Sequence, residues 1–162
     1  MPHVLFICTA NICRSPVVEG MFRNALTKRG LAGWTTASAG TWAIMKRGAS
    51  TNSVTAMAER GIDISRHQAQ IVTEQLLSNS DLVLCMEAGH AEALRAEFPS
   101  HIHKIFLFTE MINRRYNISD PYGGSREQYE RMAKDVELVL REGFDDIIDR
   151  AQANAAARGG AG

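Results

Sequence analysis

Apolar residues along the chain fall into short runs that are separated by longer segments with helical periodicity. Runs with the length and composition of β-strands occupy residues 3–7, 34–39, 81–86 and 103–108. Helical spacing predicts helices over residues 15–28, 52–60, 73–78, 88–97 and 125–142, the last with a continuation to 150. Strands that alternate with helices in this way are typical of a parallel sheet covered by helices on both faces.

Residues that favour helix ends mark the boundaries of these elements. Ser15 is expected to be the N-cap of the first helix, with Pro16 at the first helical position. Gly30 and Gly61 are expected to stop the first and second helices, and Pro99 follows the fourth. Loops therefore join the carboxyl ends of strands to the amino ends of helices, which is where parallel sheets bind ligands.

Length and composition are those of one globular domain. Of the 162 residues, 45% are hydrophobic, so we expect a single domain over 1–150. An Ala- and Gly-rich tail over 151–162 is expected to be partly helical or disordered. Lys and Arg together number 18, as do Asp and Glu, so the basic excess of a nucleic-acid-binding protein is absent.

Three further patterns bear on the location of the protein. The chain has no run of 18 apolar residues, so no membrane-spanning helix is expected. Its first residues lack the basic and apolar pattern of a signal peptide. The three cysteines, an odd number, are expected to be reduced. Together these patterns predict a cytoplasmic protein with no membrane or nucleic-acid partner.

The loop after the first predicted strand carries the candidate chemistry. Residues 8–15 read Cys-Thr-Ala-Asn-Ile-Cys-Arg-Ser. A loop of this length before a helix can turn its amide groups inward and bind an anion, and Arg14 adds a fork of N–H donors that matches phosphate oxygens. Next to these amides and the positive charge of Arg14, Cys8 is expected to be a thiolate that can attack phosphorus. Spacing alone would also fit a buried cysteine and a surface arginine, but the position between a strand and a helix favours the catalytic interpretation.

Asp120 is the candidate general acid. A departing alkoxide or phenoxide needs a proton, which a carboxylic acid can supply before it acts as a base toward water. The sequence Asp-Pro-Tyr-Gly-Gly at 120–124 is by itself typical of a turn. Its combination with the cysteine loop favours a catalytic role for Asp120. The acids Asp63, Glu87 and Asp135 have no comparable context and are expected to be solvated charges.

The motif Cys-x-x-Asn-Ile-Cys-Arg-Ser-Pro at 8–16 resembles that of the low-molecular-weight protein tyrosine phosphatase family. The resemblance covers about 3–148 and includes the segments at 38–41, 81–87 and 120–124. It implies an α/β three-layer sandwich with a four-stranded parallel sheet and a phosphate-binding loop after the first strand. It also implies that a phosphorylated protein is hydrolysed through a cysteinyl-phosphate intermediate, without metal or other cofactor.

The resemblance assigns roles to individual residues. Cys8 would be the nucleophile, Arg14 the phosphate clamp and Asp120 the general acid and then base. Phosphate or another oxyanion would be held by the loop residues Thr9, Ala10, Asn11, Ile12, Cys13 and Arg14.

Supporting residues are expected around this loop. Asn11 tolerates the left-handed conformation that a tight loop needs, and the family implies that Ser38 and His67 hold it. Ser15 can donate a hydrogen bond to the Cys8 thiolate. Tyr122 is expected to form one wall of the substrate cleft.

Trp42 and Cys13 each have two interpretations. Trp42 is expected to form the other wall of the cleft, although a tryptophan in a loop can simply cover the core, and ungapped counting puts Ile44 at the family's aromatic position. Cys13 is close enough to Cys8 for a protective disulfide, or is an inert thiol that faces the core. Cys85 is expected to be a small buried hydrophobic residue.

Departures from the family pattern leave alternatives open. Residues 47–50 lack a common proline, 67–70 have Gln where Arg is common, and Ala10 replaces a frequent Gly. A protein arginine phosphatase would share the loop and the acid but is expected to carry Thr in place of Ile12, and an apolar Ile favours an aryl ester. A thiol-linked arsenate reductase would need two cysteines after the third strand, where Cys85 stands alone. An anion-binding module without enzymatic activity would not require both Cys8 and Asp120.

Overall fold

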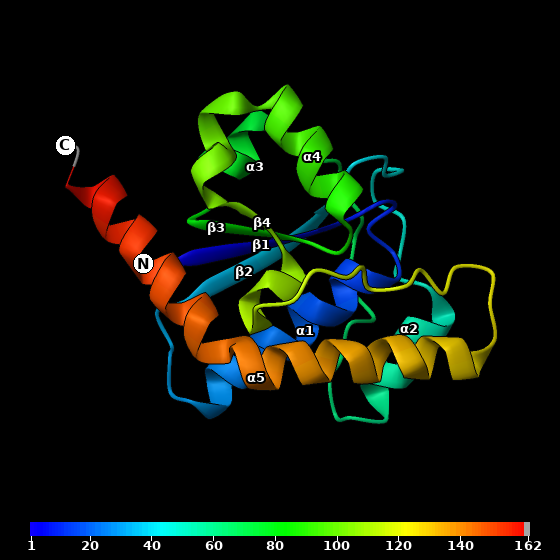
Figure 1. Ribbon diagram of the computed structural model, residues 1–162. Helices are drawn as coiled ribbons and strands as arrows, with labels where there is room; N and C mark the ends of the chain where they lie inside the picture. The colour runs from blue at the N-terminus through cyan, green and yellow to red at the C-terminus, as the bar shows by residue number, and fades with distance from the viewer. Residues whose placement is uncertain (161–162) are drawn as a thin grey trace.

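The computed structural model describes residues 1–160 (Figure 1). Along the chain the elements are β1 His3–Cys8, α1 Arg14–Lys28, β2 Thr35–Gly40, α2 Thr51–Ala58, α3 Glu74–Ser78, β3 Leu82–Cys85, α4 Ala88–Glu97, η1 Pro99–Lys104, β4 Ile105–Leu107, η2 Phe108–Ile112 and α5 Arg126–Gly159. The two η elements are short 3₁₀ helices.

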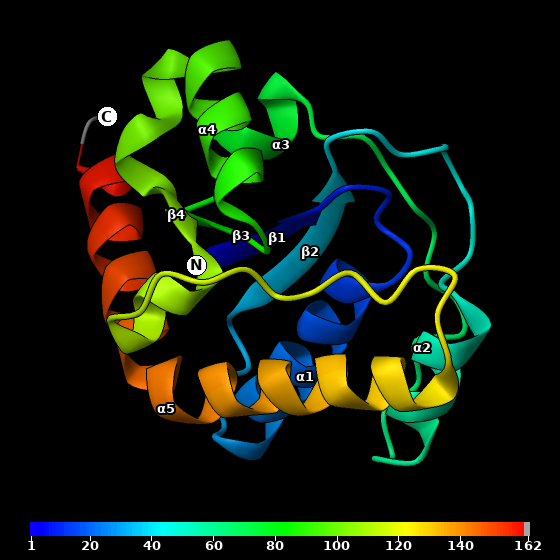
Figure 2. The same ribbon diagram turned by 45° about the vertical axis from the view of Figure 1, so that its right-hand side comes forward.

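The four strands form one parallel sheet in the order β2-β1-β3-β4. Helices α1, α2 and α5 cover one face of the sheet, and α3 and α4 cover the other (Figures 1 and 2). The α/β three-layer architecture expected from the alternation of strands and helices is therefore confirmed. Because β1 lies between two neighbours, its carboxyl end opens at the middle of the sheet edge, between the two helical layers.

Alternate residues of β1 pack into the two halves of the core. Phe6 faces α1 and α5, and its ring meets the rings of Phe22 and Phe108 edge to face at 5.5 and 6.1 Å. Leu5 and Ile7 face the other helical layer. All three β1 side chains are fully buried, so β1 and the residues that follow it are held from both sides.

The start of the first helix differs from the sequence prediction. Helix α1 begins at Arg14, with Cys13 in the N-cap position, so the prediction of a Ser15 N-cap is wrong. The Ser15 hydroxyl contacts Cys8 and Asn11 instead of capping the helix.

The fourth strand is also shorter than predicted, because 3₁₀ helices occupy both of its flanks. One of them turns Lys104 into the interior, where its Nζ donates 2.8 Å to the carbonyl of Ser80. Phe108 is apolar and buried in its 3₁₀ turn, so it continues the pattern of the strand, which is why the prediction ran past the end of β4.

The final helix is longer than the segment predicted for it. Ser125 and Gln128 form a capping box at its start, and the helix continues through most of the Ala-rich segment to Gly159. Asn154 donates to the carbonyl of Asp81 at 2.8 Å, and Arg158 lies 3.2 Å from the Asp81 carboxylate, so this extension packs against the start of β3. Residues 161–162 of the predicted tail lie outside the described residues.

In the part of the chain that the structure describes, no helix has both the length and the apolar character needed to cross a membrane.

Candidate active site

The phosphate-binding loop predicted at 8–15 lies at the carboxyl end of β1, where the two helical layers meet. Cys8 is the last residue of β1, and α1 starts at Arg14. The segment that follows β2 supports the loop from one side. Thr41 N donates to Cys8 O at 3.0 Å, and Trp42 N donates to Thr9 O at 2.9 Å. These two bonds fix the beginning of the loop against the end of β2.

Only glycine fits at position 40, where β2 comes nearest to the loop. A Cβ added to Gly40 would lie 2.3 Å from Thr9 O and 3.1 Å from Asn11 N. Both are backbone atoms, which cannot swing aside as the end of a side chain can. The close approach of the two backbones gives the Ser-Ala-Gly-Thr segment at 38–41 a physical role.

Asn11 sets the curvature of the loop. Its φ is 58°, in the left-handed region. Its side-chain Nδ2 donates to Ser15 Oγ at 2.8 Å and to Ser38 Oγ at 2.9 Å, and its Oδ1 accepts from Gln70 N at 3.0 Å. His67 Nε2 lies 2.6 Å from the carbonyl oxygen of Asn11, so this nitrogen carries the proton. The expected contacts from Ser38 and His67 are present in the structure, and Gln70 adds a third.

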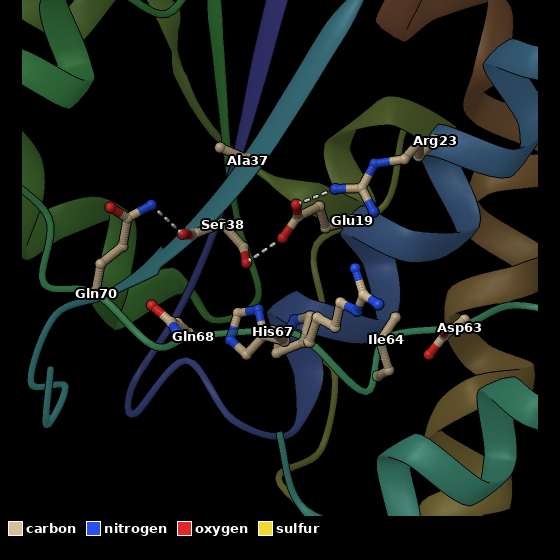
Figure 3. Close-up of a pocket in the computed structure, with 11 residues that line it drawn as sticks. Glu19, Arg23, Ala37, Ser38, Asp63, Ile64, His67, Gln68 and Gln70 are labelled. Atoms are coloured by element: carbon tan, nitrogen blue, oxygen red, sulfur yellow. Dashed lines mark hydrogen bonds and ion pairs between the residues drawn. The ribbon is translucent and has the colours of Figure 1, made fainter. Parts of the chain in front are cut away.

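A second layer of polar side chains lies behind these supports and lines a separate pocket of about 300 Å³ (Figure 3). Ser38 Oγ donates to Glu19 Oε2 at 2.6 Å, and Gln70 Nε2 donates to Ser38 O at 3.0 Å. Glu19 also pairs with Arg23 on the next turn of α1. Sequence reasoning missed Glu19, although its position one turn after the Ser-Pro pair places it on the helix face behind the loop.

The main-chain amides of the loop are available to an anion. Within residues 1–160, none of the N–H groups of residues 9–13 donates to a backbone carbonyl. Successive N–H groups that converge at the start of a helix form a concave site for anions, and the helix dipole adds partial positive charge. This region can therefore bind a phosphate group without any lysine.

Arg14 is buried beside the loop, with 1% of its surface exposed. Its Nη1 donates to Ile118 O at 2.8 Å and lies 3.3 Å from Glu87 Oε1. Its Nη2 lies 3.4 Å from Thr9 Oγ1 and 3.5 Å from Asp120 Oδ2. Its Nε is buried and has no partner in the structure. Because one edge of the guanidinium is held firmly, Nε and Nη2 are left as a fork that can bind two phosphate oxygens.

Ser15 is oriented toward the candidate nucleophile. Cys8 Sγ lies 2.9 Å from Ser15 Oγ, and both residues are buried. Ser15 Oγ already accepts a hydrogen bond from Asn11 Nδ2. Its own hydrogen is therefore free to point at the sulfur, where it would stabilise negative charge.

Cys8, Arg14 and Asp120 line one cavity of about 210 Å³. The full lining consists of Cys8, Thr9, Ala10, Ile12, Cys13, Arg14, Trp42, Arg47, Asp120 and Tyr122. Sequence reasoning missed Arg47, which belongs to a loop without a recognisable motif.

Two exposed aromatic residues flank this cavity. Trp42 is 75% exposed and Tyr122 is 61% exposed, and both are lining residues. Trp42 therefore does not cover the core, and Ile44 is not part of the lining. Tyr122 N donates to Asp120 Oδ1 at 3.0 Å, which directs the carboxyl group at the mouth of the cavity.

The three cysteines have different surroundings, and all of them are free thiols. Cys13 Sγ lies 3.0 Å from Ser50 Oγ and 3.4 Å from Tyr129 OH. Burial raises the pKa of the Cys13 thiol, and it raises the pKa of Tyr129 to about 12. Burial also strongly raises the pKa of Cys85, which is inside β3 with no exposed surface. Cys85 is the buried hydrophobic residue that was expected.

The expectation that Glu87 is a solvated charge is wrong. Its carboxylate lies 3.3 Å from Arg14 Nη1 and 3.1 Å from His90 Nε2. Glu87 follows β3 in the sequence, and the carboxyl ends of adjacent parallel strands meet at one edge of the sheet. That rule could have identified it. Asp63, by contrast, is exposed as predicted, whereas Asp135 is half-buried.

Comparisons with known proteins agree with this geometry. The family model described as "Low molecular weight phosphotyrosine protein phosphatase" matches residues 3–153. A probable low molecular weight protein-tyrosine-phosphatase, EpsP of Ralstonia nicotianae, is 34% identical over 93% of this chain and 96% of its own length. A protein-arginine-phosphatase of Bacillus subtilis is 31% identical over 86% of this chain and 92% of its own.

Solved structures agree as well. The low molecular weight protein tyrosine phosphatase from T. tengcongensis superimposes with a TM-score of 0.86 at 35% identity, covering 90% of this chain and 99% of the other.

Proposed function

Because the chain belongs to the low molecular weight phosphotyrosine protein phosphatase family, we propose that it hydrolyses phosphotyrosine in proteins through a phosphate group carried on Cys8. Cys8 is the nucleophile, Arg14 binds the phosphate, and Asp120 acts as general acid and then as general base. One observation carries the proposal: Asp120, which is far from the loop in sequence, lines the same cavity as Cys8 and Arg14.

In the first step the phosphate binds in the loop. Its oxygens accept hydrogen bonds from the amides of residues 9–13 and from Nε and Nη2 of Arg14. The Cys8 thiolate then attacks phosphorus, so that a P–S bond forms while the bond from phosphorus to the tyrosine oxygen breaks. Asp120 gives its proton to the departing oxygen, which leaves as a neutral phenol.

In the second step water hydrolyses the cysteinyl phosphate. Asp120, now a carboxylate, accepts a proton from the water as its oxygen attacks phosphorus. The P–S bond breaks, and the sulfur leaves as a thiolate. The Ser15 hydroxyl, 2.9 Å from Cys8 Sγ, stabilises that negative charge, and inorganic phosphate is the product. Both steps leave the charge on the loop side of the cavity, where the amides and Arg14 lie.

The lining of the cavity supports an aryl phosphate as the substrate. The exposed rings of Trp42 and Tyr122 flank the entrance, where they can hold a phenyl ring between them. Ile12 is 2% exposed and contributes an apolar side chain to the same lining. An aromatic leaving group would contact apolar surface on three sides.

A protein arginine phosphatase on the same scaffold is the second candidate function. It is favoured by the 31% identity to the protein-arginine-phosphatase of Bacillus subtilis. Ile12 argues against it, because a guanidinium group gains less than a phenyl ring from an apolar neighbour. Thiol-linked arsenate reduction is disfavoured because Cys85 has no exposed surface.

The test of this proposal is a pair of variants at the loop. Cys8→Ser should lose turnover of p-nitrophenyl phosphate while it still binds inorganic phosphate, because the amides and Arg14 remain. Arg14→Lys should lose phosphate affinity, because a single ammonium group cannot replace the bidentate fork. Wild-type turnover by Cys8→Ser would contradict the proposal.

Substrate choice is tested separately. Rates on one peptide sequence carrying phosphotyrosine or phosphoarginine should be compared side by side. We expect faster hydrolysis of the phosphotyrosine peptide. Faster hydrolysis of the phosphoarginine peptide would favour the second candidate without changing the roles of Cys8 and Arg14.

A further inference from the structure

His90, on the first turn of α4, is buried against the phosphate-binding loop, and its side chain is 8% exposed. Its Nε2 lies 2.9 Å from Thr9 Oγ1 and 3.1 Å from Glu87 Oε2. Thr9 and Glu87 in turn contact Nη2 and Nη1 of Arg14, at 3.4 and 3.3 Å. These four side chains form a closed ring, in which the imidazole lies opposite the guanidinium.

We propose that His90 is a positioning residue, which holds the Thr9 hydroxyl and the Glu87 carboxylate so that Arg14 keeps the orientation that binds phosphate. This inference rests on the proposed function, because it takes Arg14 to be the phosphate clamp. His90 does not itself line the cavity that contains Cys8. It acts on the reaction only through its two neighbours.

The contacts of His90 determine which of its nitrogens carries the proton. A carboxylate can only accept hydrogen bonds, so the contact with Glu87 requires an N–H at Nε2. Nδ1 is buried without a partner, and in this tautomer it is left with only a lone pair. Burial, and after it the positive charge of Arg14, lower the pKa of His90, although Glu87 and Asp120 oppose them. His90 is therefore a neutral hydrogen-bond donor at neutral pH.

Arg14 depends on this donor because its two nitrogens are held unequally. Nη1 has a firm bond of 2.8 Å to the carbonyl of Ile118. Nη2 has only long contacts, to Thr9 Oγ1 and to Asp120 Oδ2 at 3.4 and 3.5 Å. Without His90, the Thr9 hydroxyl could rotate its hydrogen toward the guanidinium, and Glu87 would lose one of its partners. The Nη2 side of the fork would then no longer be fixed for phosphate.

The experiment compares variants that keep or remove the donor. His90→Gln keeps a neutral N–H near the position of Nε2, His90→Leu removes it, and Thr9→Val removes the hydroxyl with little change of shape. We would measure the inhibition constant of inorganic phosphate, with kcat and KM for p-nitrophenyl phosphate. His101→Leu is the matched control, because His101 is a similarly buried histidine that pairs with Glu74 at 2.6 Å, in η1 and outside the cavity lining.

We expect His90→Leu and Thr9→Val each to weaken phosphate binding about tenfold, which is the scale of losing one hydrogen bond in a charged network. His90→Gln should restore most of the affinity. The double variant of His90→Leu and Thr9→Val should bind phosphate no more weakly than whichever single variant binds it less tightly, because both changes break the same ring. His101→Leu should lower the melting temperature without changing phosphate affinity.

The inference is overturned if His90→Leu binds phosphate as tightly as the wild-type protein. If His90→Leu does not fold, Thr9→Val decides, and unchanged phosphate affinity in that variant also overturns it. Arg14→Lys distinguishes failure of the proposed function from failure of the role proposed for His90. Unchanged affinity in Arg14→Lys would refute the proposed function, whereas loss of affinity there with no effect at His90 or Thr9 would refute only this inference.

Discussion

Replacement of Gly40 by alanine tests whether the end of β2 shapes the phosphate-binding loop. The added Cβ would lie 2.3 Å from Thr9 O, whereas ordinary contact begins at 3.4 Å. The two backbones must therefore separate by about 1 Å, in a region where neither can relax by moving a side chain. That movement pulls on Thr9, which directly follows Cys8, the proposed nucleophile.

The expected cost has two parts. Forcing one methyl group into a packed region costs about 1–3 kcal/mol of folding free energy. A shift of about 1 Å in the groups that position a substrate can lower the rate about 100-fold. Thermal unfolding measures the first part, and kcat/KM for p-nitrophenyl phosphate together with the inhibition constant of phosphate measures the second.

Gly48→Ala provides the matched control. A Cβ at Gly48 meets nothing within 4 Å, and Gly48 does not have a positive φ. This variant should keep both its melting temperature and its activity. The reasoning is refuted if Gly40→Ala folds with wild-type phosphate affinity and turnover, since the loop would then tolerate the displacement.

Three further predictions concern the acid, the second thiol and the buried histidine. Asp120→Ala should slow the hydrolysis of phenyl phosphate about 100-fold or more, but that of a strongly activated aryl phosphate less, because only the poor leaving group needs the proton. Equal losses of rate on both substrates would place the acid elsewhere. Cys13→Ser should be active but recover less activity than wild type when dithiothreitol follows peroxide, and a Cys8–Cys13 disulfide should appear by mass spectrometry in oxidised wild type only; equal recovery without that disulfide would make Cys13 a packing residue. The lowered pKa of His90 means that the unfolded chain takes up a proton first as the pH falls below about 6.5. The free energy of unfolding should therefore decrease toward pH 5.5, by at most about 1.4 kcal/mol per pH unit for this one proton. Urea unfolding should show a shallower decrease for His90→Gln than for the wild type. Identical pH dependence in the two proteins would contradict the lowered pKa of His90.

Strands β1 and β3 were predictable because they are buried on both faces. The side chains of the run Val-Leu-Phe-Ile at 4–7 point to both faces of the sheet, and they can all be buried only between two helical layers. The start of α1 was not predictable from cap preferences, because Ser15 serves the loop and not the helix. The 3₁₀ turn after β4 escaped prediction because its apolar residues Phe108, Met111 and Ile112 do not distinguish it from a strand.

The candidate site was predictable where its residues are contiguous in the sequence. Cys8, Asn11 and Arg14 stand in one motif, and their spacing carries the geometry of the loop. Glu87 and His90 come from the segment after β3 and reach the loop only through the parallel order of the strands. Their chemistry is set by neighbours that the sequence does not place beside them, so they look like ordinary surface residues until the fold is known.

The central claim is that phosphate is transferred to Cys8, and trapping that intermediate tests it most directly. Asp120→Ala retains the nucleophile but lacks the base for hydrolysis, so the intermediate should accumulate when this variant reacts with p-nitrophenyl phosphate. The reaction would be quenched with acid within the first turnover, and the peptides would be analysed by mass spectrometry. The account predicts one phosphate on the peptide that contains Cys8, at the Cys8 sulfur, and none when Cys8→Ala, which has no nucleophilic atom at this position, is treated in the same way. Release of p-nitrophenol with no phosphorylated peptide, or with phosphate on a different residue, would contradict it.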